Sequence, residues 1–239
     1  MQDENQLISN TAHQALSEYW SKKLLAEYGI PVTNEILVQN RDQAVTAAKK
    51  IGFPVVLKAC GPELMHKTEA GCVELHLASE EEVLAAYDRI LSSVSPALSR
   101  DLEGILVAEM LSGARELVCG LTREPQFGPC VMLGFGGVMT EIIQDTVFRV
   151  APFDRAEAMD MIRELKSGAM LDAFRGEVPA DTDVICQCLI SLGKIGQDRP
   201  EISEIDINPL KIDPRGRITA VDALIVFAVE TGVKDAKIN

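Results

Sequence analysis

The sequence predicts an α+β fold built from two closely packed lobes. Segments with helical spacing of apolar residues alternate with short β-branched runs, a pattern typical of mixed helix and sheet content. The chain has 239 residues and is 47% hydrophobic, which is enough to bury a sizeable core. Because no tandem repeat or low-complexity linker interrupts the chain, we expect its two halves to pack against each other.

Helices are predicted where apolar residues recur at helical spacing between start and stop signals. Gly29 ends the first helix, and an Asn40 cap begins the second. Ser79 with Glu82 three residues later forms a capping box for the third. The expected helices cover residues 6–28, 40–51, 79–91, 154–166 and 180–197.

Strands are predicted where apolar runs are short and rich in β-branched residues. Residues 54–59 form one such run. Val73, Leu75 and Leu77 alternate with polar residues, which predicts a strand with one wet face. Later candidates are GILVAEM, RELVCGL, CVMLG, TVFRVAPF, EIDINPL and RITAVDALIV.

The charge and cysteine content exclude several classes of protein. The formal net charge of −13, from 36 acidic and 23 basic residues, argues against nucleic acid and anionic membrane surfaces as partners. No stretch approaches the roughly 20 apolar residues of a membrane span, and the polar N-terminus lacks an apolar export segment. The six cysteines have no CxxC or zinc spacing, which indicates reduced, buried thiols. We therefore expect a cytoplasmic protein that holds any anionic ligand locally.

Two positions in the first half are candidates for phosphate chemistry. Lys58 closes an otherwise apolar strand, where a charge is costly without a partner. A nucleotide phosphate would be a natural partner, and a lysine snorkelling from a strand end is the alternative. The loop GPELMHKTEAG carries His66 and Lys67, and an imidazole there can act as a nucleophile or be an ordinary surface histidine. His76 alternates outward on its strand and receives no role.

Two features of the second half are weaker candidates. Gly134-Phe135-Gly136-Gly137 follows a strand, so the amides of Gly136 and Gly137 can either contact a phosphate or simply form a turn. Arg149 lies among apolar neighbours, where a guanidinium requires an oxyanion ligand or an internal salt bridge.

The strongest local pattern is Glu204-Ile-Asp206-Ile-Asn208-Pro. Alternation places Glu204, Asp206 and Asn208 on one strand face, and Asp222 follows on a later strand. Mg²⁺ prefers oxygen ligands of this kind, commonly one or two carboxylates together with substrate phosphates. The alternative is a solvated strand face.

Six segments in order resemble the ATP-grasp domain of the nucleoside-diphosphate-forming acyl-CoA synthetases, which include ADP-forming acetyl-CoA synthetase and are related to succinyl-CoA synthetase. They cover almost the whole chain: LLAEYGIPVT, IGFPVVLKA, HKTEAGCVEL, VAEMLSGARELVCGLTREPQFGPCVMLGFGG, FRVAPF and EIDINPL. The resemblance implies a single ATP-grasp domain. Lobe one would cover about 30–118, and lobe two about 1–29 plus 119–239.

The resemblance also implies how this chain would bind ATP or ADP. Lys58 matches the lysine that contacts the phosphates, with Lys67 and the glycine turn nearby. Glu109 and Met110 match the segment that holds the adenine, and Glu116 matches an acidic residue near the ribose.

The same resemblance assigns the metal and the reacting groups. Asn208 and Asp222 match the Mg²⁺ ligands, Asp206 matches an acidic position near the reacting phosphates, and Arg149 would face them too. His66 would take a phosphoryl group from a partner's phosphohistidine and pass it to ADP. The carboxylate that orients His66 is left open.

The implied reaction converts acyl-CoA, ADP and phosphate into acid, ATP and CoA. The acyl chemistry would belong to a CoA-binding α subunit in an α₂β₂ heterotetramer, and this chain would be active only with it. Two alternatives remain, an ATP-grasp carboxylate ligase and a non-catalytic regulatory nucleotide-binding subunit. The second gains weight because Thr68-Glu69-Ala70, Cys72 and Gln144-Asp145-Thr146 depart from the family pattern.

Overall fold

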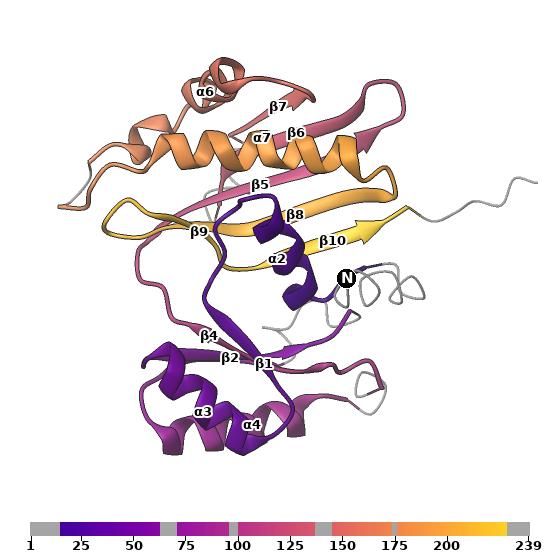
Figure 1. Cartoon of the computed structure of the whole chain (residues 1–239). Helices are drawn as coiled ribbons and strands as arrows, with labels where there is room; N and C mark the ends of the chain where they lie inside the picture. Colours follow the sequence, from indigo (N-terminus) through magenta and orange to yellow (C-terminus); the bar gives the residue numbers. More distant parts are fainter. Residues whose placement is uncertain (1–14, 63–70, 96–99, 137–144, 174–175, 229–239) are drawn as a thin grey trace, which may run out of the picture.

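The computed structural model describes residues 15–62, 71–95, 100–136, 145–173 and 176–228. They form two lobes, each organised around one β-sheet, with helix α2 between the sheets (Figure 1). His66, Lys67 and Gly137 lie outside the described residues. Strands and helices are present in similar proportion, and the predicted α+β organisation with two lobes is confirmed.

Lobe one contains a four-stranded antiparallel sheet with two helices on one face. Its strands, in sheet order, are β1 (Glu35–Val38), β4 (Gly104–Glu109), β2 (Val55–Cys60) and β3 (Val73–Leu77). The helices are α3 (Arg41–Ile51) and α4 (Glu80–Ser93). Both predicted caps are confirmed, because the side chains of Asn40 and Ser79 accept hydrogen bonds from the third residue along the chain. Gly52 ends α3 with a φ of 100°, which favours glycine.

The predicted alternation of β3 is interrupted. Leu57 pairs with Glu74 and Val55 pairs with Leu77, so the register shifts by one residue between them. His76 adopts a positive φ of 59° at this irregularity. The expectation that Leu75 faces the core is therefore wrong, since Leu75 is 52% exposed.

Lobe two contains a larger antiparallel sheet that the second half of the chain supplies. Its strands, in sheet order, are β10 (Ala223–Phe227), β8 (Ile202–Ile212), β5 (Arg115–Glu124), β6 (Gly128–Phe135) and β7 (Thr146–Val150), with β9 (Ile218–Ala220) also paired to β8. Helices α6 (Arg155–Glu164) and α7 (Thr182–Asp198) and the short 3₁₀ helix η3 (Gly168–Leu171) complete the lobe. RITAVDALIV is two strands rather than one, because the chain leaves the sheet at Val221 and Asp222.

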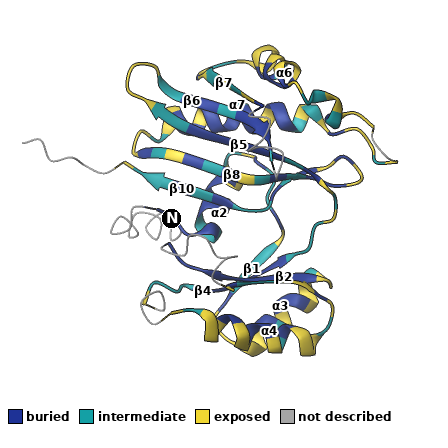
Figure 2. Ribbon diagram, turned by 180° about the vertical axis from the view of Figure 1, so that it is seen from behind, coloured by how far each residue is buried: buried dark blue, intermediate teal, exposed yellow. Residues whose placement is uncertain are grey.

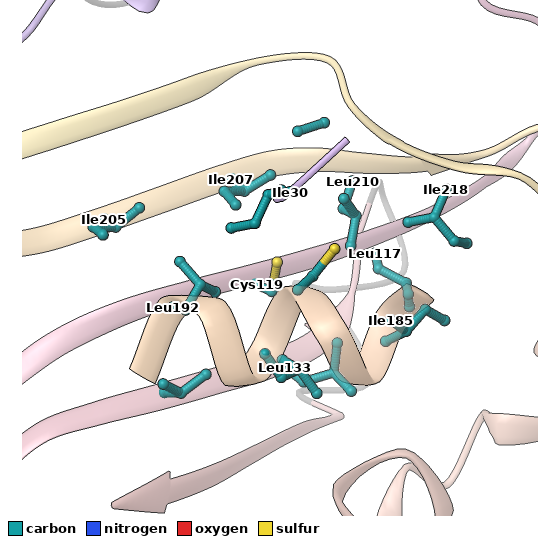
Figure 3. Close-up of a cluster of buried hydrophobic side chains, with 14 of the residues drawn as sticks. Ile30, Leu117, Cys119, Leu133, Ile185, Leu192, Ile205, Ile207, Leu210 and Ile218 are labelled. Atoms are coloured by element: carbon teal, nitrogen blue, oxygen red, sulfur yellow. The ribbon is translucent and has the colours of Figure 1, made fainter. Parts of the chain in front are cut away.

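Helix α7 packs on one face of this sheet, and their contact forms the main core (Figure 3). Ile185 and Leu192 of the helix lie against Leu117, Ile205 and Ile207 of the strands. The core also contains the buried thiols of Cys119, Cys186 and Cys188. All six cysteines are buried, which confirms the prediction of buried thiols.

Close approach of α7 to the sheet depends on Gly196. A Cβ at this position would lie 2.5 Å from Cδ1 of Leu121 and 2.7 Å from Cβ of Pro129, whose ring has little freedom to move. We expect Gly196→Ala to lower the free energy of unfolding by about 1–2 kcal/mol, because overpacking outweighs the helix propensity gained. Urea denaturation measures the change. Gly168→Ala is the control, since its nearest contact would be 3.6 Å, and equal effects would contradict the prediction.

Helix α2 (Glu18–Glu27) lies between the two sheets (Figure 1). Leu24 and Leu25 belong to the lobe-two core, whereas Glu18 and Lys22 make ion pairs with lobe one. Residues 6–14 of the predicted helix lie outside the described residues. Ala15 forms a β-bridge with Val226, and the helix begins at Glu18.

Within the part of the chain that is described, two segments connect the lobes, residues 28–34 and residues 110–114. The predicted boundary between residues 118 and 119 falls inside β5, which already belongs to the lobe-two sheet from Arg115. Among the described residues, no helix combines the length and apolar character needed to cross a bilayer.

Candidate functional site

Helix α7 covers one face of the lobe-two sheet, which we call the helix face, and we call the other the open face (Figure 2). The predicted residues divide between these faces. Side chains of residues directly opposite each other on neighbouring strands share a face. Ile205, Leu121 and Val131 form such a row and are buried in the core that includes α7. Side chains alternate between faces along a strand, so the residue before and the residue after each of these three lie on the open face.

Asp206 lies on this open face, in a row that crosses the sheet. It is opposite Gly120, which pairs with Met132, which in turn pairs with Phe148. A Cβ on Gly120 would lie 2.4 Å from the carbonyl oxygen of Ile205, so the strands tolerate only glycine there. Glu204 and Asn208 share the face of Asp206, as the sequence predicts.

Asn208 and Asp222 are brought together at the end of this strand. The backbone N–H of Asn208 donates to the carbonyl oxygen of Asp222 at 3.2 Å. Burial raises the pKa of the Asp206 carboxyl, and the charges of Glu204 and Asp222 raise it further. The sequence therefore concentrates negative charge and amide oxygen at one point of the open face.

These oxygen groups fit Mg²⁺ in the form that binds with a nucleotide. Within the described residues, no group of three or more His, Cys, Asp or Glu side chains forms a ready cage for a metal. Mg²⁺ commonly uses one or two carboxylates and completes its octahedron with water and phosphate oxygens. Asp222, Asn208 and Asp206 provide that smaller set of hard ligands.

Glu116, the predicted ribose neighbour, lies on the open face of β5. Its carboxylate accepts a hydrogen bond from Nζ of Lys211 at 3.2 Å, and its carbonyl accepts one from the N–H of Gly136 at 2.7 Å. A Cβ on Gly136 would lie 3.2 Å from Cβ of Glu116, so the absence of a side chain permits this close approach. The amide of Gly136 is consequently used by the protein itself.

Lys58 projects from β2 of lobe one toward lobe two. Its Nζ donates to Oε1 of Glu18 at 2.7 Å and to the carbonyl oxygen of Val221 at 3.2 Å, and it lies 3.7 Å from Oδ2 of Asp222. Burial lowers the pKa of the ammonium group, but the charges of Glu18 and Asp222 outweigh this effect and the pKa is raised. The partner that the apolar strand required is thus a carboxylate of this chain.

Lys22 completes a buried charge network around Lys58. Its Nζ donates to the same two acceptors, Oε1 of Glu18 at 2.8 Å and the Val221 carbonyl at 3.1 Å. It also donates to Thr33 at 3.1 Å and pairs with Glu35. Burial raises the pKa of Glu35, while the charge of Lys22 opposes the change. We call Glu18, Lys22, Glu35 and Lys58 the inter-lobe network.

Glu109 and Met110 lie at the end of β4, where the chain crosses to lobe two. The Glu109 carboxylate accepts a hydrogen bond from the N–H of Asn34 at 2.7 Å, and the N–H of Glu109 donates to the Asn34 carbonyl at 3.0 Å. Met110 donates its N–H to the Pro54 carbonyl at 3.3 Å. These bonds fix the two lobe connections side by side.

The structure does not bring Arg149 to the other predicted residues. Arg149 is opposite Val131, which is buried on the helix face, and it pairs with Glu164 of α6. Phe148 takes the open-face position instead. We expected Arg149 to face the reacting phosphates, but it forms the alternative internal salt bridge. Strand alternation does not reveal which face of the sheet α6 covers.

Four charged residues at the site were missed by sequence reasoning, namely Glu18, Lys22, Glu35 and Lys211. Glu18 and Lys22 are one helical turn apart, a spacing typical of an exposed ion pair on a helix surface. In the structure the pair is buried instead. Lys211 follows EIDINPL directly, but only the pairing of β8 with β5 reveals that it is opposite Glu116.

Comparisons with known proteins agree with this arrangement. The model of the ATP-grasp domain family matches residues 8–227. The chain is 38% identical to the β subunit of ADP-forming acetate–CoA ligase I of Pyrococcus furiosus, with 90% of this chain and 93% of the relative covered. It is 41% identical to ADP-forming acetate–CoA ligase I of Archaeoglobus fulgidus, but the match, over 87% of this chain, spans only 30% of that longer protein.

Solved structures give the same result. The dinucleotide-forming acetyl-coenzyme A synthetase 1 of Ca. Korarchaeum cryptofilum, in complex with coenzyme A, Ca-AMPCP and HgCl⁺, matches with a TM-score of 0.88 and 42% identity. The match covers 95% of this chain and 99% of that one. In a complex of the same enzyme with coenzyme A and Mg-AMPPCP, which matches with a TM-score of 0.81, 40% identity and the same coverage, a phosphohistidine segment points towards the nucleotide binding site. The two-lobed fold, the matched family model and these relatives together show that the chain belongs to the ATP-grasp family and, within it, to the β subunits of ADP-forming acyl-CoA synthetases.

Proposed function

We propose that the chain binds ADP or ATP between its lobes and exchanges a phosphoryl group with a phosphohistidine. The observation that carries the proposal is the meeting of Lys58 and Asp222 at 3.7 Å, a cation from lobe one and a carboxylate from lobe two. A nucleotide phosphate with its metal ion needs both kinds of group at one place. Glu109 and Met110, where the chain crosses between the lobes, are assigned to the adenine, and Glu116 is assigned to the ribose.

Asp222, Asn208 and Asp206 are the residues that would hold Mg²⁺. The ion supplies positive charge that stabilises the phosphates during transfer. Lys58 contributes a fixed ammonium group, which a preorganised site provides without reorganisation. Lys67 is assigned to the same phosphates.

His66 is proposed as the phosphoryl acceptor of this chain. The neutral imidazole is a competent nucleophile near pH 7, and the Korarchaeum complexes include a phosphohistidine segment. The Pyrococcus relative is a β subunit, so we propose a separate CoA-binding α subunit as the partner in an α₂β₂ assembly. The acyl substrate would bind to that subunit.

The direct test is labelling of the chain with phosphate from ATP. We expect incubation with γ-labelled ATP, Mg²⁺ and the partner subunit to give a label on this chain that is acid-labile and base-stable. Mass spectrometry after mild digestion should locate it on His66. A label that resists acid, or that maps to another residue, would contradict the assignment.

Asp222 provides a test of the metal site. We expect Asp222→Asn to raise the Mg²⁺ concentration that half-saturates ADP binding by about tenfold, the loss of roughly 1.4 kcal/mol of ligand energy. Calorimetric titration of ADP at a series of Mg²⁺ concentrations measures this shift. Glu204→Gln on the same face of β8 is the control and should leave the midpoint unchanged. Equal shifts in both variants would show a general loss of negative charge rather than a lost ligand.

A further inference from the structure

The inter-lobe network holds Lys58 in a specific way. Both of its buried acceptors, Oε1 of Glu18 and the Val221 carbonyl, are shared with Lys22. An ammonium group has three N–H donors arranged as a tripod. Two of those on Lys58 are used by the shared acceptors, and Oδ2 of Asp222 lies 3.7 Å from the same nitrogen.

Lys22 and Lys58 differ in what surrounds them. Lys22 has four partners within the protein, because Thr33 and Glu35 add to the two shared acceptors, and its side chain is 1% exposed. The side chain of Lys58 is 8% exposed, and that of its neighbour Asp222 is 41% exposed. Lys22 is therefore surrounded by protein groups, whereas Lys58 lies next to a carboxylate that solvent can reach.

Among the described residues, the charges of the network balance without Asp222. Glu18 and Glu35 match Lys22 and Lys58 as two buried carboxylates and two buried ammonium groups. Because a buried charge needs a compensating one, the carboxylate of Glu18 stabilises both ammonium groups that it contacts. Asp222 is an additional carboxylate at the edge, which makes it available to a cation.

We propose that Glu18 is a positioning residue that acts through Lys58, fixing the ammonium group where a nucleotide phosphate approaches next to Asp222. The proposal rests on the phosphate-binding role assigned to Lys58 above. Glu18 comes from α2, a helix of the lobe-two core, whereas Lys58 comes from β2 of lobe one. The contact that positions Lys58 therefore crosses from one lobe to the other.

The first experiment measures the affinity of Glu18→Gln for two ligands by equilibrium dialysis. We expect the Kd for Mg-ADP to rise about tenfold, equivalent to roughly 1.4 kcal/mol, because the ammonium group is no longer held by a charged acceptor. The Kd for adenosine, which has no phosphate, should not change. Equal weakening of both ligands would overturn the proposal, since it would indicate a general change in the position of the lobes.

Glu35→Gln is the matched control. It makes the same substitution in the same network, but Glu35 contacts Lys22 rather than Lys58. We expect it to lower the thermal midpoint and to leave the affinity for Mg-ADP unchanged. A loss of affinity equal to that of Glu18→Gln would assign the effect to the network as a whole and overturn the specific role of Glu18.

A double-mutant cycle tests whether Glu18 acts through Lys58. In the Lys58→Met background, Glu18→Gln should cause no further loss of Mg-ADP affinity, whereas independent effects would add and contradict the proposal. If Glu18→Gln alone fails to fold, the variant Glu18→Gln/Lys22→Met removes one buried anion and one buried cation together and serves in its place. Wild-type protein that binds no Mg-ADP would overturn the proposed function and this role with it. Unchanged binding by Glu18→Gln would overturn the positioning role alone.

Discussion

Replacing His66 by Asn is expected to abolish acyl-CoA synthetase turnover in the presence of the partner subunit. Asparagine keeps a polar side chain of similar reach but cannot form the phosphorylated intermediate, so the route between the partner's phosphohistidine and ADP is interrupted. Loss of a covalent nucleophile removes most of an enzyme's catalysis, and we expect a decrease of at least roughly 1,000-fold in kcat. Release of CoA from acyl-CoA, ADP and phosphate measures it.

Two further measurements distinguish loss of phosphoryl transfer from a general loss of function in the His66 variant. Mg-ADP binding should persist, because the imidazole is assigned to transfer and not to nucleotide affinity. His76→Asn is the matched control, since His76 is exposed on β3 and asparagine tolerates its positive φ of 59°. Full turnover by the His66 variant would reject the relay through this residue.

Replacing Lys58 by Met is expected to be the next most severe change. Methionine preserves most of the apolar stem in β2 but removes the cation that faces Asp222. Loss of one preorganised charge at a reacting phosphate costs on the order of 100- to 1,000-fold in kcat. Steady-state kinetics with saturating nucleotide would separate this decrease from a change in KM.

Lys22→Met is the control that distinguishes catalysis from folding. Lys22 uses the same two acceptors as Lys58 but has its other partners inside the protein. We expect this variant to lower the midpoint of thermal unfolding, because Glu35 is left buried without its cation, while Mg-ADP affinity is retained. If both lysine variants lost turnover equally, the effect of Lys58→Met would be structural.

The local structure of the chain was largely predictable from its sequence. Caps at Asn40 and Ser79, the buried run at 55–60 and the shared face of Asp206 and Asn208 all follow from interactions within a few residues. The departures occur where distant segments intervene. Ala15 pairs with Val226 of β10 and is not helical. The register shift in β3 leaves Leu75 exposed to solvent.

The site was predictable in its residue types but not in its partners. The cost of a charge in an apolar strand indicated that Lys58 needed an anion, yet nothing near it in sequence identified Glu18, which is 40 residues away. Arg149 illustrates the converse case. Its need for an anion was predicted correctly, but α6 supplies Glu164 on the face opposite Asp206, and only the packed helix reveals this.

The position of α2 has a consequence for the order in which the chain becomes structured during synthesis. Among the described residues, the core of lobe one draws only on positions between 36 and 107, so this lobe can collapse as soon as that segment has left the ribosome. Lobe two cannot, because β10 at the other end of the chain pairs with the segment that leads into α2. Glu18 and Lys22 precede lobe one in the chain, yet α2 gains its second packing surface only when residues 223–227 arrive. The junction that presents Lys58 is therefore expected to be among the last parts of the molecule to form.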